Sequence, residues 1–150
     1  MGAVGVMLLA GAVSVPMAVS ACGGREAAAP TTTRAATSGA CKTAPRALVT
    51  VIATRLTEHE TLRDARAVRS ETKRVWFVSA EIDGPGLEGD GEIGTWAKAG
   101  PLAPAGGAIL AVDTVFAQVL SGWEPGDRTY SDVTMEDAGA EESRACVRNR

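Results

Sequence analysis

Apolar residues recur at intervals of three and four in the stretch that follows Pro45. This period places them on one face of a helix that runs toward His59. Thr43 is the predicted N-cap, and Pro45 suits the first turn because its ring presets the helical φ. The predicted apolar stripe consists of Leu48, Val51, Ile52 and Leu56.

The next two stretches are rich in β-branched and aromatic residues. LRDARAVRSE (62–71) and KRVWFVSAEI (73–82) predict the two arms of a hairpin that turns within residues 70–73. The second arm is apolar on both faces except at Ser79 and Glu81. A strand buried on both faces belongs in the middle of a sheet, so we expect this arm to be a central strand.

Two further strands are predicted at GEIGTWAKA (91–99) and GAILAVD (107–113), which are joined by a connection rich in proline and glycine. Together with the hairpin they make about four strands. The strands follow one another too closely for crossover helices, so the sheet is predicted to be antiparallel.

Helical spacing returns after the last predicted strand. Asp113 is a predicted N-cap and Gly122 a predicted stop for a short helix from Thr114 to Ser121. A last helix that carries Cys146 is predicted within residues 131–147. The predicted fold class is therefore α+β: a sheet of about four antiparallel strands, with an N-terminal helix, a short helix after the last strand and a C-terminal helix.

Composition fits one modest globular domain, because the chain has 150 residues of which 45% are hydrophobic. The net charge of -3 argues against a nucleic-acid partner. Charge is uneven: residues 42–74 hold eight basic and four acidic side chains, whereas residues 124–142 hold seven acidic and one basic. Either the basic part faces anionic headgroups or a wall polymer, or the opposite patches neutralise each other within the fold.

The first 24 residues carry no charge, and their apolar run at 4–13 is followed by small residues. This order is typical of a secretory signal, and the run is too short for a membrane span. Val19, Ser20, Ala21 and Cys22 resemble the lipobox of bacterial lipoproteins. The resemblance implies that residues 1–21 are a signal peptide and that Cys22 receives the lipid.

A lipidated Cys22 implies a protein anchored to the outer face of the bacterial cell membrane. Residues 22–40 have almost no large apolar side chain and are expected to act as a flexible tether for a single domain at 41–150. With Cys22 lipidated, Cys41 and Cys146 form an even pair, and we expect them to form a disulfide. The domain is loosely similar to small actinobacterial lipoproteins that have no assigned activity.

The segment EIDGPGLEGDGEIG (81–94) holds five carboxylates among its glycines. An EF-hand would need glycine where Ile93 stands and glutamate where Ala99 stands. We therefore expect a solvated connection, with no metal and no cofactor. The carboxylates that would have to serve as ligands in a cation site are Asp83, Glu88, Asp90 and Glu92.

Motifs for catalysis are scarce. The chain has one histidine, His59, and neither a GxSxG nor an HExxH motif, which disfavours triad hydrolases and zinc proteases. A carboxylate-dependent surface hydrolase is the alternative function, and it requires Glu81, Asp83 or Asp113 to converge in a pocket. The three tryptophans lie in apolar stripes, where core packing is favoured over a ligand platform: Trp76, Trp96 and Trp123.

The sequence thus favours a non-enzymatic role. The predicted function is that of a lipid-anchored, extracytoplasmic binding or interaction module. Its expected partner, apart from the membrane that holds the anchor, is a protein or a polymer of the cell envelope.

Overall fold

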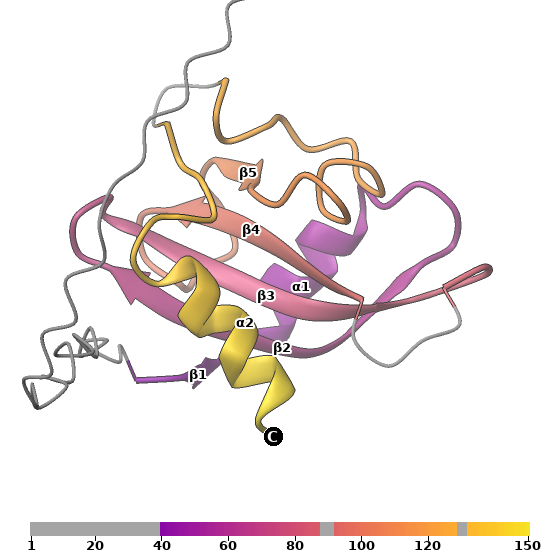
Figure 1. The fold of residues 1–150 in the computed structure, drawn as a ribbon, viewed down its shortest axis with the longest axis horizontal. Helices are drawn as coiled ribbons and strands as arrows, with labels where there is room; N and C mark the ends of the chain where they lie inside the picture. Colours follow the sequence, from indigo (N-terminus) through magenta and orange to yellow (C-terminus); the bar gives the residue numbers. More distant parts are fainter. Residues whose placement is uncertain (1–39, 88–91, 129–131) are drawn as a thin grey trace, which may run out of the picture. The chain divides into compact units, whose positions relative to one another are not determined.

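The computed structural model of the chain describes residues 40–87, 92–128 and 132–150. Within this part, five strands form one antiparallel sheet in which neighbours in sequence are also neighbours in space (Figure 1). The predicted α+β class and antiparallel sheet are therefore confirmed, with five strands in place of about four. The strands are β1 (Lys42–Thr43), β2 (Thr61–Ser70), β3 (Val75–Asp83), β4 (Ile93–Ala99) and β5 (Ile109–Ala111), and the helices are α1 (Arg46–Ala53) and α2 (Ala140–Arg148).

The hairpin of β2 and β3 forms as the alternation predicts. Ser70 pairs with Val75, so the turn occupies residues 71–74, one position later than predicted. Strand β3 pairs with β2 on one side and β4 on the other, which gives it the predicted central position. Residues of β3 alternate between the two faces of the sheet, and both faces are covered.

Helix α1 covers one face of the sheet and helix α2 the other (Figure 1). Leu48 and Ile52 of α1 are buried one turn apart, and they belong to the same apolar cluster as the fully buried Trp96. On the opposite face, Phe77 belongs to a second buried cluster, and Val147 of α2 is also buried. Each helix buries one face, as expected for elements that cover a sheet.

The first helix begins without the predicted threonine cap. Thr43 lies in β1, where its hydroxyl accepts a hydrogen bond from the Arg66 guanidinium at 2.9 Å. Pro45 takes the N-cap position, and its carbonyl accepts a bond from the Leu48 N–H. The threonine was predicted as a cap because β1, with only two exposed residues, has no periodic pattern to identify it as a strand.

Helix α1 also ends earlier than predicted, at Ala53. The residues that follow turn toward another part of the chain, where the Gly122 N–H donates to the Arg55 carbonyl at 2.8 Å. His59 lies beyond the helix with a φ of 62°, so it is not at the helix end. A tertiary hydrogen bond thus takes the place of the helical bonds that the apolar spacing predicted.

The predicted short helix at Thr114–Ser121 is wrong, because residues 114–119 form successive turns. Asp113 does act as a cap, since its Oδ1 accepts hydrogen bonds from the N–H groups of Phe116 and Ala117. However, the Gln118 N–H bonds back to the Asp113 carbonyl, five residues away instead of four. The regular ladder of an α-helix is therefore not established.

The last helix forms within the predicted region but begins only at Ala140. Gly139 precedes it with a φ of 103°, and the Glu142 carboxylate accepts a hydrogen bond from the Gly139 N–H at 2.7 Å. Thr134 and Asp137 form an earlier, separate turn, in which the aspartate accepts from the threonine N–H at 2.8 Å. A residue that needs positive φ cannot lie inside a helix, and this sets the boundary.

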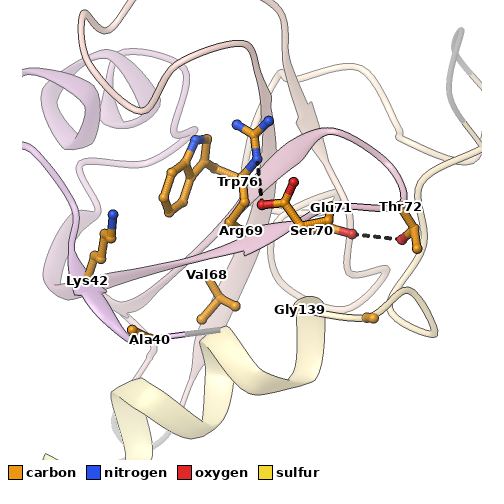
Figure 2. A pocket seen from close by; sticks show the side chains of 10 residues that line it. Ala40, Lys42, Val68, Arg69, Ser70, Glu71, Thr72, Trp76 and Gly139 are labelled. Carbon is orange, nitrogen blue, oxygen red and sulfur yellow. Dashed lines mark hydrogen bonds and ion pairs between the residues drawn. The ribbon is translucent and has the colours of Figure 1, made fainter. Parts of the chain in front are cut away.

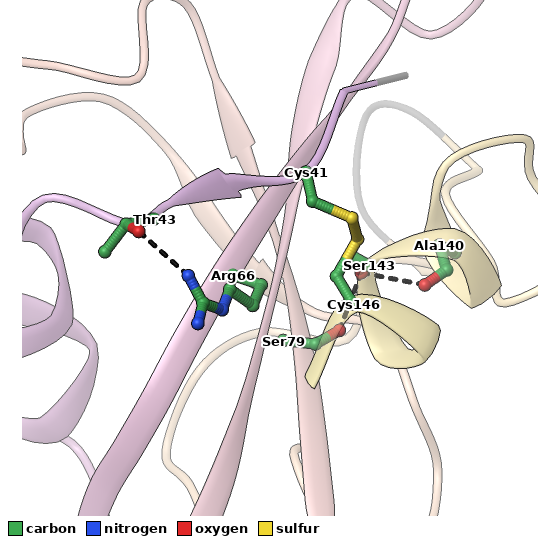
Figure 3. The surroundings of a disulfide bond; sticks show 7 residues. All are labelled: Cys41, Thr43, Arg66, Ser79, Ala140, Ser143 and Cys146. Carbon is green, nitrogen blue, oxygen red and sulfur yellow. Dashed lines mark hydrogen bonds between the residues drawn. A yellow bond between two sulfur atoms is a disulfide. The ribbon is translucent and has the colours of Figure 1, made fainter. Parts of the chain in front are cut away.

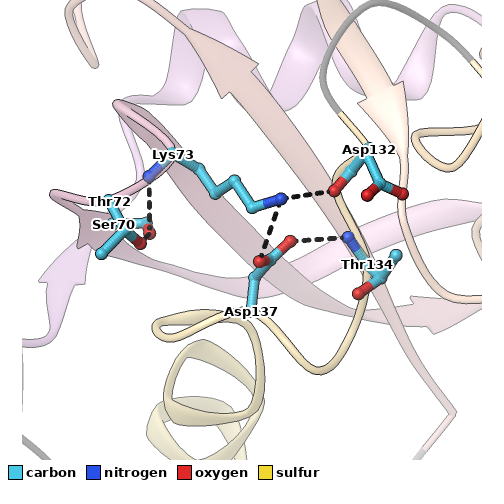
Figure 4. A network of polar contacts seen from close by, with 6 residues as sticks. All are labelled: Ser70, Thr72, Lys73, Asp132, Thr134 and Asp137. Atoms are coloured by element: carbon cyan, nitrogen blue, oxygen red, sulfur yellow. Dashed lines mark hydrogen bonds and ion pairs between the residues drawn. The ribbon is translucent and has the colours of Figure 1, made fainter.

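Lys73 in the turn of the β2–β3 hairpin bonds to the segment that leads into α2 (Figure 4). The Lys73 ammonium donates to the Asp132 carbonyl at 2.6 Å and lies 3.3 Å from the Asp137 carboxylate. The hydroxyl groups of Ser70 and Thr72 are 3.1 Å apart in the same turn. The hairpin end and the approach to α2 are thereby fixed relative to each other.

Candidate functional site

A cavity of about 680 Å³ lies at the edge of β2 (Figure 2). The edge is open here because β1 pairs only with Arg66 and Ala67 of β2, so residues 68–70 have a strand partner on the β3 side alone. The cavity is lined by residues 68–72, Ala40, Lys42, Trp76 and residues 138–139. It therefore lies between the hairpin end, the start of β1 and the start of α2.

Trp76 is placed at this cavity by the register of the hairpin. Arg69 and Trp76 are directly paired, so their side chains lie on the same face of the sheet. Lys42 pairs with Ala67, two positions along the same face. The Lys42 Nζ atom is 5.0 Å from the centre of the Trp76 ring, and the Arg69 Cζ atom is 5.6 Å from it (Figure 2). Both distances are typical of cation–π contacts.

The two cations beside this ring differ in whether they have a partner of opposite charge. Arg69 Nε lies 3.7 Å from a Glu71 carboxylate oxygen, but the Glu71 side chain is 85% exposed, so solvent weakens the pair. In the part of the chain that the structure describes, the Lys42 ammonium has no hydrogen bond or ion pair and lies over the Trp76 ring. The site thus presents cations that the fold itself does not neutralise fully.

Trp76 is the residue for which the expectation of simple core packing needs correction. Trp96 is fully buried, and the Trp123 indole N–H donates to the Ile52 carbonyl at 3.0 Å, so both serve the fold. Trp76 packs partly against the same core but also lines the cavity. Its Nε1 is buried and has no hydrogen-bond partner in the described part of the chain, so packing and cations hold the ring.

Lys98 of β4 is the strand partner of Trp76 on the side of β3 away from β2, and it does not line the cavity. It is 0% exposed, and its ammonium donates to the carbonyls of Ala99 and Pro101. Burial lowers the pKa of Lys98 below its ordinary value of 10.5, because the charged form loses hydration. This lysine therefore organises the loop after β4 and is closed to a ligand.

The predicted lipidation residue, Cys22, lies outside the described residues. Cys41 and Cys146 are bonded to each other, with Cα atoms 5.9 Å apart, within the usual range for a disulfide (Figure 3). The bond joins the residue before β1 to helix α2. Because Lys42 directly follows Cys41, the bond also ties the strand that carries Lys42 to α2.

The three carboxylates of the hydrolase alternative each have a structural partner. Glu81 pairs with Arg150 at 2.5 Å, and Asp83 pairs with Arg63 at 3.4 Å. Asp113 is buried. Its carboxylate accepts hydrogen bonds from three backbone N–H groups, those of Phe116, Ala117 and, at 2.6 Å, Thr95. None of the three lines the cavity at Trp76.

The carboxylates of the possible cation site are only partly described. Glu88 and Asp90 lie outside the described residues. Asp83 is engaged with Arg63, and Glu92 flanks the start of β4, where its carbonyl accepts a hydrogen bond from the Ile82 N–H. In the described part of the chain, no three His, Cys, Asp or Glu side chains are grouped so that they could hold a metal ion.

Comparison with known proteins adds no family. No protein-family model, no curated protein and no solved structure matches this chain. Neither helix in the described ranges has the length and apolar character needed to cross a membrane. The site must therefore be interpreted from its own geometry.

Proposed function

We propose that the chain is a lipid-anchored, extracytoplasmic binding module whose partner contacts the cavity at Trp76. The observation that carries the proposal is the indole of Trp76 held beside two cations, Lys42 and Arg69, at an open strand edge. Concave sites that combine an aromatic surface with a few polar groups are the usual form of binding sites.

The anchor is proposed from the sequence Val19 to Cys22, which resembles a lipobox. The bond between Cys41 and Cys146 supports the same compartment, because disulfides persist in oxidising environments outside the cytosol. Lipidation at Cys22 would place the domain at the outer face of the membrane, with a protein or an envelope polymer within reach.

Binding is favoured over hydrolysis because each candidate catalytic carboxylate is bonded to a structural partner. A hydrolytic pair needs two carboxylates that face one substrate, one of them with a raised pKa. Here Glu81 and Asp83 are in separate ion pairs, and Asp113 caps a turn. The cavity contains a single carboxylate, Glu71, which is exposed to solvent.

Cross-linking on intact cells tests this proposal. A photoreactive residue in place of Glu71 lies at the rim of the cavity, and one in place of Val119, which is 64% exposed, serves as the matched control away from it. We expect a discrete adduct from position 71 that disappears when Trp76→Leu is added. The same adduct from both positions, or none from position 71, would contradict the proposal.

A further inference from the structure

The polar groups at the Trp76 cavity are mostly hydrogen-bond donors. Lys42 brings an ammonium group and Arg69 a guanidinium group, and neither can accept a hydrogen bond. The hydroxyls of Ser70 and Thr72 are bonded to each other and are adaptable. Glu71 is the single carboxylate in the lining. A complementary ligand must therefore supply acceptor oxygens and negative charge.

Two cations flank the ring of Trp76. The Lys42 ammonium and the Arg69 guanidinium lie 5.0 and 5.6 Å from the ring centre, so the electrostatic potential around the ring is positive. The exposed pair with Glu71 offsets this only for Arg69, and only weakly. A bound anion would reduce this uncompensated positive charge and gain a charge-assisted hydrogen bond from Lys42 or Arg69.

Resting on the proposed binding function, we infer that the cavity binds the phosphate group of a phosphate ester. A phosphate group combines negative charge with several acceptor oxygens, which suits a cavity whose cations are an ammonium and a guanidinium. The apolar part of the ester lies against the indole, which lines the same cavity.

The position of the cavity favours a phosphodiester of the membrane surface as the source. Ala40, where the described chain begins, lines the cavity, and Cys22 precedes it by eighteen positions. If Cys22 carries the lipid and this segment behaves as the flexible tether that its composition predicts, it would span about 20 to 25 Å and leave the lipid headgroups within reach of this site. A weak single site is sufficient there, because the anchor raises the effective concentration of headgroups. A phosphodiester polymer of the envelope would offer the same chemistry.

The test uses the full chain with Cys22→Ala, so that no attached lipid contributes to binding. The probes are glycerophosphoglycerol as a soluble phosphodiester, phosphatidylglycerol vesicles and phosphatidylcholine vesicles, with affinity measured by calorimetry and co-sedimentation. Lys42→Gln and Arg69→Gln should each weaken phosphodiester binding about tenfold, as expected for a lost charged hydrogen bond. Added salt should weaken it as well.

Two further variants make the test independent of folding damage. Glu71→Gln should strengthen binding several-fold, because it frees the Arg69 guanidinium, and a damaged fold would not produce a gain. Arg55→Gln is the matched control, since Arg55 lies 4.4 Å from the ring of Trp123, away from the cavity, and it should leave binding unchanged.

Tighter binding to phosphatidylglycerol vesicles than to the soluble diester would assign the site to the membrane. Equal binding would assign it to a free or polymeric phosphodiester. Absence of binding both to glycerophosphoglycerol and to phosphatidylglycerol vesicles at millimolar concentration, or equal losses in Arg55→Gln and Lys42→Gln, would overturn the inference. Because cross-linking from position 71 requires no phosphate, it can succeed where this test fails, which distinguishes the two proposals.

Discussion

The hydroxyl groups of Ser79 and Ser143 lie 2.6 Å apart although the two residues are 64 positions apart in the chain (Figure 3). Ser79 is in the central strand and also lies 3.0 Å from the Thr95 hydroxyl, while Ser143 in α2 donates to the Ala140 carbonyl at 2.8 Å. All three hydroxyl-bearing residues are fully buried. This network gives α2 a fixed position on an otherwise apolar face of the sheet.

Replacing two members of the network together should cost less than the two single replacements added. Ser79→Ala should lower the free energy of unfolding by about 1–3 kcal/mol, because it leaves buried hydroxyls without a partner. The double variant Ser79→Ala with Ser143→Ala should lose less than the sum of the single losses, since both ends of the bond are removed together. Urea unfolding measures this, and strictly additive losses would contradict the proposed coupling.

The disulfide should be a major source of stability. Cys41 and Cys146 are 105 positions apart, and in the chain-entropy model a bond that closes such a long loop stabilises by about 3–5 kcal/mol. Adding reductant, or the double variant Cys41→Ala with Cys146→Ala, should lower the thermal midpoint clearly. Cys22→Ala is the control and should leave the midpoint unchanged. A midpoint that does not respond to reductant would show that the bond contributes little.

Asp113 should behave as a structural cap. Asp113→Ala removes the acceptor of three backbone N–H groups, and we expect a loss of about 3–5 kcal/mol in unfolding free energy. Asp113→Asn should lose less, because its amide oxygen still accepts. Asp127→Ala, at an exposed position nearby in sequence, is the control and should change stability by less than about 0.5 kcal/mol. Similar small losses in all three would refute the capping role.

Lys98 should make stability depend on pH in the alkaline range. Its pKa is lowered in the folded protein, so the unfolded chain binds more protons there, and the free energy of unfolding rises with pH. The rise should begin near the lowered pKa and end as the pH passes 10.5, the ordinary value. Lys98→Met should remove it, whereas Lys42→Met should not. Identical pH slopes in wild type and Lys98→Met would count against this account.

Much of the fold could be predicted because two patterns in the sequence are purely local. The alternation at 62–71 and 73–82 predicts the β2–β3 hairpin, and the two-sided apolar character of the second arm predicts its central position. Residues 114–121 show where this reasoning fails. Their helical spacing is genuine, but the Gln118 N–H bonds five residues back to the Asp113 carbonyl. The Leu120 carbonyl accepts a hydrogen bond from the distant Thr57 N–H, and such tertiary bonding overrides local propensity.

Only part of the candidate site could be predicted from the sequence. The sequence predicts that Arg69 and Trp76 lie in the two arms of one hairpin, but the turn predicted at 70–73 would not have set them opposite each other, as the observed turn at 71–74 does. Lys42 could not be foreseen, because it comes from a two-residue strand that has no pattern of its own. The open edge of β2 likewise depends on how short β1 is.

The proposed compartment and the choice of partner depend on lipidation at Cys22, and metabolic labelling tests it most directly. Cells that express the chain are grown with a clickable palmitate analogue, and the labelled protein is followed by fractionation. We expect label on the wild-type protein in the membrane fraction, and neither label nor membrane retention with Cys22→Ala. Equal labelling of both forms, or an unlabelled wild-type protein with reduced Cys41 and Cys146 in the cytosol, would contradict the account.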